Sequence, residues 1–112
     1  MTHDTDAVML GSLVTAVRAK NAGPFKVTID IFAGNPDVYA HIRTQLDTAI
    51  IAELLQVPLN DLQRFELDDL RVLKFSFPRP VVQGSVRDRD MHGAQFAWLL
   101  HELPIARPVT HP

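Results

Sequence analysis

The segment "FKVTIDIF", residues 25–32, carries the clearest secondary-structure signal in this 112-residue chain. Its apolar side chains alternate with polar ones, so that Phe25, Val27, Ile29 and Ile31 share one side of an extended backbone. A period of two is typical of a strand that is buried on one face and exposed on the other. We therefore predict a strand here that belongs to a sheet with one covered face.

The segment before this strand favours a helix. Thr5 or Asp4 can cap it, and apolar residues then recur near helical spacing to about Lys20. Arg18 and Lys20 would lie in its last turn, where positive charge suits the helix dipole. The helix would end in "RAKNAGPF", residues 18–25, because Asn and Gly tolerate left-handed backbone and Pro cannot continue a helix.

The segment after the strand predicts two helices. Asn35 and Pro36 suit the cap and the first position of a helix over residues 36–45. A second helix, "TAIIAELLQV", is capped by Asp47 or Thr48.

Two further strands are expected in the second half of the chain. Residues 71–77 alternate clearly and stop at Pro78. The segment "FAWLLHELPI" predicts a last strand over residues 97–105, with Trp98 in the core. These two strands could pair antiparallel across the loop between them, and the first strand would lie beside one of them.

Together these segments give three strands and three main helices. We predict an α+β fold, a two-layer sandwich with a small, mainly antiparallel sheet, ferredoxin-like or related. The length suits a single domain over residues 1–112, with its core in about 5–105 and a Pro-rich tail over 106–112.

The composition excludes several classes of protein and site. The net charge of −2 argues against nucleic acid as a main partner, because phosphate binding needs a clustered positive surface. The absence of cysteine excludes disulfides, thiolate chemistry and Cys-based zinc sites. No stretch approaches the ~20 apolar residues that span a bilayer, and the first residues lack the pattern of a signal peptide. We therefore expect a cytoplasmic protein with no membrane partner.

The loop "GSVRDRDMHGAQ", residues 84–95, has the densest polar content. Asp88, Asp90 and His92 are its candidate catalytic groups, and they could hold a divalent cation through oxygen and imidazole ligands. Their spacing differs from that of a calcium loop, and a solvated, self-paired loop is the favoured alternative. We therefore predict no metal and no cofactor.

Arg79 lies between two prolines in "FPRPVVQGS", residues 77–85. An Arg on stiff, extended backbone can present its planar fork to a carboxylate or a phosphate with little ordering cost. A solvated strand end explains the same residues equally well.

Two stretches together, "RAKNAGPFKVTIDIF" and "PRPVVQGSVRDRDMHGAQ", resemble the paired signatures of a small family of unknown function. This is the family of AtuA-related small proteins, domain-of-unknown-function family 4387. The residues that fit the first signature are Arg18, Lys20, Asn21, Ala22, Gly23, Pro24, Phe25, Asp30 and Ile31. Those that fit the second are Pro78, Arg79, Pro80, Gly84, Ser85, Asp88, Asp90, Gly93, Ala94 and Gln95. The chain departs from the family pattern at Ala19, Val86, Arg87, Arg89, His92 and Phe96.

The resemblance implies a partner rather than a reaction. Members of the family accompany, or are fused to, a large protein similar to acyclic terpene utilisation protein A (AtuA), which is linked to catabolism of branched acids as their coenzyme A thioesters. It implies that the chain is a small accessory subunit, with the large partner holding most of a hydratase- or lyase-like site. A non-catalytic assembly module and a stand-alone small-ligand binder are the alternatives. We also expect a homo-oligomer, which would complete a pocket or cover strand edges.

The signatures also define a candidate site. Ending a helix needs Asn or Gly and a Pro but not two cations, so we expect Arg18, Lys20 and Asn21 to contact a ligand or a partner. Our hypothesis is that they converge with the second signature on one face. That face would be a subunit interface or a shared active site for a carboxylate or a thioester phosphate. The candidate residues of the second signature are Arg79, Ser85 and Gln95, with Asp88 and Asp90 beside them.

Overall fold

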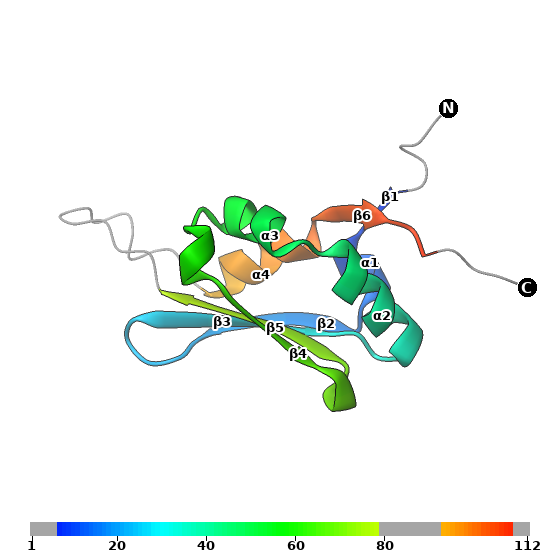
Figure 1. The fold of residues 1–112 in the computed structure, drawn as a ribbon, viewed down its shortest axis with the longest axis horizontal. Coiled ribbons are helices and arrows are strands. Elements are labelled where there is room, and N and C mark those ends of the chain that lie inside the picture. Colours follow the sequence, from blue (N-terminus) through cyan, green and yellow to red (C-terminus); the bar gives the residue numbers. More distant parts are fainter. Residues whose placement is uncertain (1–6, 79–92, 109–112) are drawn as a thin grey trace, which may run out of the picture.

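The computed structural model describes residues 7–78 and 93–108 and shows two layers (Figure 1). One layer is a four-stranded antiparallel sheet, and the helices lie together on one of its faces. The strand order is β2–β3–β5–β4, so β2 and β4 form the two edges. The strands are β2 (Ala16–Asn21), β3 (Lys26–Phe32), β4 (Gln63–Leu67) and β5 (Val72–Pro78).

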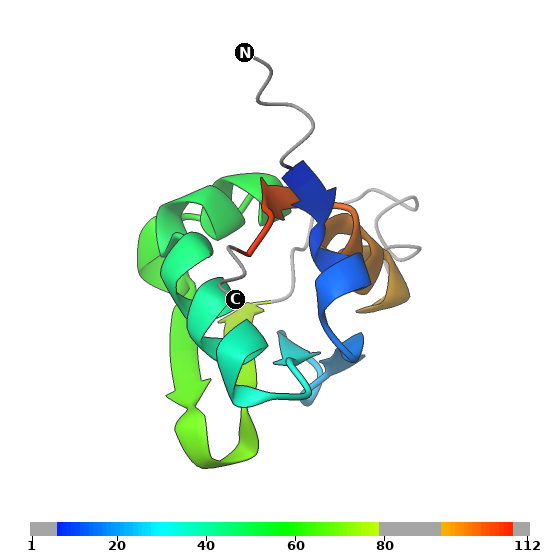
Figure 2. The same cartoon turned by 90° about the vertical axis from the view of Figure 1, so that its right-hand side faces the viewer.

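The second layer holds the helices and a small two-stranded sheet (Figure 2). Its strands β1 (Ala7–Met9) and β6 (Pro104–Ala106) pair antiparallel, with Val8 opposite Ile105. This pairing brings the two ends of the described chain together. The helices are α1 (Leu10–Leu13), α2 (Pro36–Gln45), α3 (Thr48–Leu55) and α4 (Gly93–His101), and two short 3-10 turns, η2 (Leu59–Asp61) and η3 (Asp68–Leu70), flank β4.

The core lies between the two layers, on the helix side of the sheet. Val27, Ile29 and Ile31 of β3 are fully buried in it, so residues 25–32 give the strand and the covered face that their alternation predicts. Phe25 is the exception, because it lies in the turn before β3 with 71% of its surface exposed. The inward residues of β5 are Leu73, Phe75 and Phe77, and those of α4 are Phe96 and Leu100.

Helices α2 and α3 begin where their capping residues predict. Asn35 Oδ1 accepts a hydrogen bond from Val38 N at 2.9 Å, and Asp47 Oδ1 accepts one from Ala49 N at 2.9 Å. Helix α2 has the predicted bounds. Helix α3 ends just before Gln56, which adopts left-handed backbone with φ of 60°. Local capping chemistry is therefore sufficient to place these two helices.

The helix predicted to about Lys20 is wrong. Among the described residues 7–21, only 10–13 are helical, and residues 16–21 form the edge strand β2, which pairs antiparallel with β3. Along β2 the half-buried Val17 and Ala19 alternate with the exposed Arg18 and Lys20. This is the period of a strand, and it is masked in the sequence because Ala19 is too small to stand out as an apolar position.

The segment "RAKNAGPF" is therefore not a helix end but the end of β2 and a hairpin loop. Residues 22–25 connect β2 to β3, and Ala22 N donates to Lys26 O at 2.8 Å across the base of the loop. Gly23 adopts a φ of +79°, a conformation that glycine takes without steric cost. The same Gly and Pro that suggest a helix stop also suit a tight connection between strands.

The strand predicted over residues 97–105 is also wrong. Residues 93–101 form α4, and only residues 104–106 are extended, in a strand that pairs with β1 rather than with β5. Phe96 and Leu100 are buried while Trp98 between them is 59% exposed, which is the spacing of a helix and not of a strand. A short apolar run such as "FAWLL" fits both structures until its neighbours are known.

The predicted fold class is confirmed. The described residues form a two-layer α+β structure with antiparallel sheets, consistent with a ferredoxin-like or related arrangement. The predicted strand over 71–77 is β5, and it lies beside the first predicted strand, β3. The predicted element counts were too low, because the described residues hold six strands and four α-helices rather than three of each.

Candidate functional site

The residues of the first signature lie on the edge strand β2. Arg18, Lys20 and Asn21 are all exposed, but successive residues of a strand point to opposite faces. Arg18 and Lys20 therefore share the face that points away from the helices, and Asn21 belongs to the helix side, opposite Val27. Within the described part of β2, the first signature thus faces both sides of the sheet.

The second signature falls largely outside the described residues. Arg79, Ser85, Asp88, Asp90 and His92 all lie in the segment 79–92, which the structure does not describe. The described members are Pro78, at the end of β5, and three residues at the start of α4, Gly93, Ala94 and the exposed Gln95.

The described ends of the two signatures meet at one end of the large sheet. Pro78 pairs with Lys26, directly after the β2–β3 hairpin loop. Helix α4 runs antiparallel to β2 above the sheet, so its first turn lies toward the same end (Figure 1). The segment 79–92 therefore leaves and rejoins the described chain beside the hairpin that carries the first signature.

An open groove lies between β2 and α4. Its lining residues are Val17, Arg18, Ala19, Ala97, Trp98 and His101, and its volume is about 360 Å³. The indole of Trp98 stacks on the imidazole of His101, with ring centroids 5.3 Å apart and an interplanar angle of 9°. Sequence reasoning missed both rings as site residues because it assigned them to a strand. The apolar residues Phe96 and Leu100, four positions apart as on one face of a helix, are the signal in the sequence that could have revealed them.

Gly11 of α1 makes room for His101. A Cβ atom at position 11 would lie 2.2 Å from ring atoms of His101, so the imidazole packs directly on the backbone of α1. His101 Nδ1 is buried and has no hydrogen-bond partner among the described residues. The back of the groove is thus held by close packing of two helices.

Helix α4 presents an exposed stripe beside the groove. Phe96 and Leu100 of α4 point into the core, whereas Trp98 and Leu99 are 59% and 36% exposed. Gln95 and Glu102 flank them on the same exposed side of the helix. The stripe therefore has an apolar centre and polar ends. We call the groove and this stripe together the β2–α4 surface.

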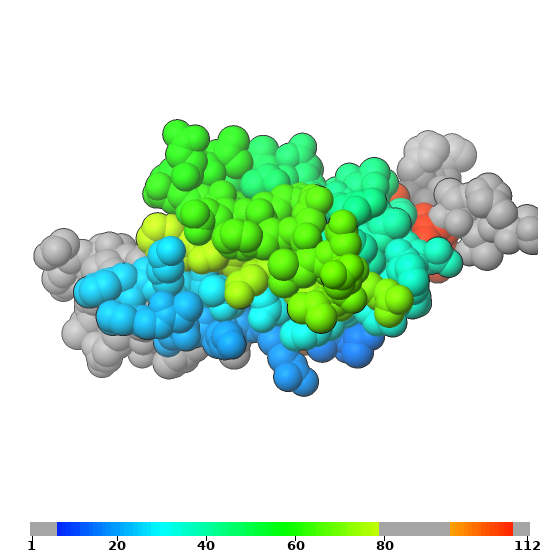
Figure 3. Space-filling model, turned by 60° about the horizontal axis from the view of Figure 1, so that its bottom comes forward, coloured from blue at the N-terminus to red at the C-terminus, as the bar shows by residue number. Residues whose placement is uncertain are grey.

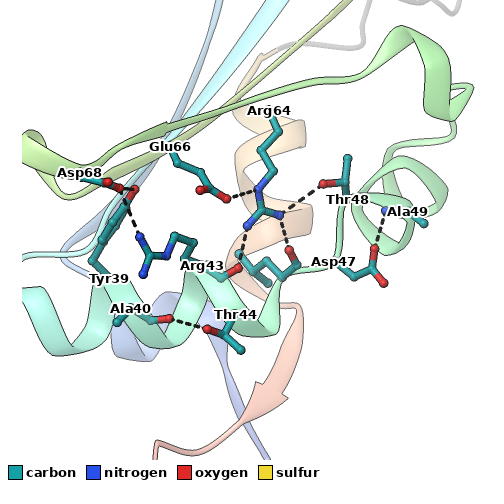
Figure 4. A network of polar contacts seen from close by, with 11 residues as sticks. Tyr39, Ala40, Arg43, Thr44, Asp47, Thr48, Ala49, Arg64, Glu66 and Asp68 are labelled. Atoms are coloured by element: carbon teal, nitrogen blue, oxygen red, sulfur yellow. Dashed lines mark hydrogen bonds and ion pairs between the residues drawn. The ribbon is translucent and has the colours of Figure 1, made fainter.

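A cluster of polar contacts around Arg64 of β4, at the edge of the sheet opposite β2, joins the sheet to the helices (Figure 4). The Arg64 guanidinium of β4 donates to Glu66 Oε2 at 2.9 Å and to Arg43 O at 2.7 Å, and also to Leu46 O. These two carbonyls lie at the end of α2, where backbone acceptors have no partner within the helix. Arg64 therefore connects the sheet to the α2–α3 junction, which is a structural role.

Tyr39 belongs to the same cluster. Its hydroxyl donates to Asp68 Oδ1 at 2.5 Å, and the Arg43 guanidinium lies 3.4 Å from the same oxygen. Burial, followed by the hydrogen bond to Asp68 and the negative charge there, raises the pKa of Tyr39 to about 12. A phenol held in its neutral form in this way is not a base at neutral pH.

Residues 7–78 and 93–108 contain neither a metal-binding cluster nor a membrane-spanning helix. No three His, Asp or Glu side chains in those ranges gather closely enough to hold a metal ion. No helix in the same ranges is both long enough and apolar enough to cross a membrane. The loop carboxylates Asp88 and Asp90 lie outside these ranges.

The family model described as "Domain of unknown function (DUF4387)" matches residues 10–104. The chain belongs to this family. The match spans both signatures, so the family predicted from them is confirmed, whereas the link to an AtuA-like partner is still a prediction. No curated protein and no solved structure gives a significant match.

Proposed function

We propose that this chain is a small accessory subunit that docks on a large AtuA-like protein through the β2–α4 surface. The pair would act in catabolism of a small organic acid or its coenzyme A thioester, with the large protein holding most of a hydro-lyase site. The observation that carries the docking role is the exposure of Trp98 and Leu99 beside the edge strand β2.

The exposed side chains on α4 are of the kind that bind other proteins. Trp98 is the one tryptophan of the chain, and it leaves 59% of its surface in solvent although Phe96 and Leu100 of the same helix are buried. Large aromatic side chains with polar neighbours are enriched among the residues that dominate binding energy at interfaces. The stripe on α4 therefore fits a partner contact.

The edge strand next to the stripe adds a second reason. No described residue pairs with the outer side of β2, and an edge strand is a template for pairing with another chain. Arg18 of the first signature lines the groove between them, and Gln95 of the second lies on the adjacent stripe. The signatures thus border the surface that a partner would cover.

The groove between β2 and α4 fits part of an active site that is completed by a partner better than it fits a whole active site. It is open to solvent and is lined by the rings of Trp98 and His101 and by residues of β2, while the Arg18 guanidinium lies over Phe32 on the other face of the sheet. Chemistry on a small acid needs groups that exclude water and surround the reacting atoms. We infer that the large partner supplies that enclosure.

Co-purification tests the proposal. The chain is tagged and co-expressed with a large AtuA-like protein, and a stoichiometric complex is expected to elute. Trp98→Ala should weaken binding by about thirtyfold, because a central aromatic anchor contributes roughly 2 kcal/mol or more. The matched control is Phe65→Ala, which truncates another exposed aromatic, 41% exposed, on the far edge strand β4.

Each outcome has a distinct meaning. Loss of the complex in Trp98→Ala but not in Phe65→Ala supports docking through the β2–α4 surface. Equal binding by both variants would place the contact elsewhere. If no large protein elutes with the native chain, the accessory role is wrong and a stand-alone binder becomes the better explanation.

A further inference from the structure

The three lysines of the chain all lie on one face of the large sheet. Lys20 of β2, Lys26 of β3 and Lys74 of β5 occupy positions that alternate with core residues, so all three point away from the helices. Figure 3 turns the underside of the molecule in Figure 1, where this face of the sheet lies, toward the viewer. Arg18 shares this face, and Asp30 lies opposite Arg18 on one side and opposite Lys74 on the other. Within the described strands, four cations and one carboxylate thus gather on this side of a chain whose net charge is −2. The overall charge conceals this clustering.

Two hydroxyl groups lie at the centre of these charges. The register places Thr28 of β3 directly opposite Lys20 of β2 and directly opposite Ser76 of β5. Lys74 lies two residues before Ser76 on β5, on the same face. Directly opposite side chains start roughly 5 Å apart and diagonal ones roughly 7–8 Å apart. The long lysine side chains can therefore reach a ligand seated on Thr28 and Ser76.

Both hydroxyl residues are buried although none of the helices in residues 7–78 and 93–108 covers this face. Thr28 is 7% exposed and Ser76 is 6% exposed. Thr28 Oγ1 has no hydrogen-bond partner in the part of the chain that the structure describes. A buried hydroxyl without a partner is costly, and the Thr28 hydroxyl is a hydrogen-bond donor that no group among the described residues uses.

Apolar side chains lie next to the cations on the same face. Phe65 of β4 is opposite Lys74 and is 41% exposed. Phe32 lies next to Arg18, whose guanidinium carbon is 5.7 Å from the centre of its ring. A bare inorganic ion would leave these rings unused, whereas an organic anion could place its apolar part against them.

We propose that this face of the sheet binds a small organic molecule through an oxyanion, a phosphate or a carboxylate, seated on Thr28 and Ser76. The two hydroxyls donate hydrogen bonds to the oxyanion, and Lys20 and Lys74 neutralise its charge. The site lies on the opposite side of the sheet from α4, so it goes beyond the proposed docking role and does not depend on it.

The test uses the full chain alone, labelled with ¹⁵N and titrated at low salt. The probes are benzyl phosphate and phenylacetate, which differ in the oxyanion but share an aromatic ring. For at least one probe, the largest changes in backbone amide chemical shift are expected at Thr28, Ser76 and Lys74. Tighter binding of benzyl phosphate assigns the site to phosphates, and tighter binding of phenylacetate assigns it to carboxylates.

Substitutions show whether the Thr28 hydroxyl binds the ligand or only stabilises the fold. Thr28→Val keeps the shape of the side chain and removes the hydroxyl, so it should weaken the favoured probe about tenfold without lowering stability. Lys74→Gln should weaken binding as well and should reduce its dependence on salt. The matched control, Thr44→Val, removes a hydroxyl from the exposed side of α2 and should bind as the native chain does.

Two results would overturn the proposal. One is that the probes change the chemical shifts of arginines on both sides of the sheet, and that Thr28→Val and Lys74→Gln leave these changes as they are in the native chain. The other is tight binding of a short oligouridylate together with weak binding of both probes, which would make the face a nucleic-acid surface. Neither result bears on co-purification with a large partner, so the two proposals can fail separately.

Discussion

Replacement of Arg64 by Met tests how the sheet is joined to the helices. Met keeps most of the length of the Arg side chain but has no hydrogen-bond donor. The Arg64 side chain is 17% exposed, and its guanidinium donates to two carbonyls at the end of α2 and, at 3.3 Å, to Thr48 Oγ1 at the start of α3. The substitution removes all of these contacts at once.

The expected cost follows from these contacts. A hydrogen bond from a charged donor contributes about 1.5–3 kcal/mol, and the ion pair with the half-exposed Glu66 adds less than ~1 kcal/mol. Water can reach the two carbonyls once the guanidinium is gone, which reduces the loss. We expect the free energy of unfolding to fall by about 3 kcal/mol and Tm by roughly 15 °C, at ~5 °C per kcal/mol for a domain of this size.

The assay is urea denaturation with thermal denaturation beside it, followed by circular dichroism. Arg107→Met is the matched control, because Arg107 is exposed and makes no hydrogen bond among the described residues, and its Tm should stay within about 2 °C. Glu66→Gln should lower the free energy of unfolding by less than ~1 kcal/mol. A loss below ~1 kcal/mol in Arg64→Met, or an equal loss in Arg107→Met, would refute the reasoning.

Two further predictions concern other parts of the fold. Tyr39 is the one tyrosine of the chain, so an ultraviolet titration of its phenolate should give a pKa of about 12 directly. Because the folded state holds this proton above pH ~10, where the unfolded state loses it, stability should be complete below that pH and fall by roughly 2–3 kcal/mol by pH ~12. Tyr39→Phe should abolish the fall, and a measured pKa near that of a free tyrosine would contradict the prediction. Gly11→Ala should lower stability by about 1–3 kcal/mol, because the new methyl group meets the His101 ring. The same change made in a His101→Ala background should cost much less, and an equal cost in both backgrounds would show that the close contact is unimportant.

The sequence predicts best the elements whose ends carry their own chemistry. Asn35 and Pro36 define the start of α2, and the alternation along β3 defines both the strand and its buried face. The errors fall where a segment is short and its partner is distant. Residues 16–21 are extended because they pair with β3, and no local signal competes with the helical spacing before them.

The candidate site also has residues that the sequence predicts and residues that it does not. The signatures direct attention to Arg18, Lys20 and Gln95, which the structure places on β2 and α4. The exposure of Trp98 could not be predicted while its segment was assigned to a strand, because a strand would bury it between Phe96 and Leu100. The gathering of all three lysines depends on strand register, which a single sequence does not fix.

The docking role of the β2–α4 surface is tested most directly through Trp98 itself. Because the chain has one tryptophan, growth on 5-fluorotryptophan gives a single ¹⁹F resonance from the exposed indole. Addition of an unlabelled large AtuA-like protein should shift and broaden this resonance until the two chains are equimolar. A resonance that stays unchanged in excess partner would contradict the account.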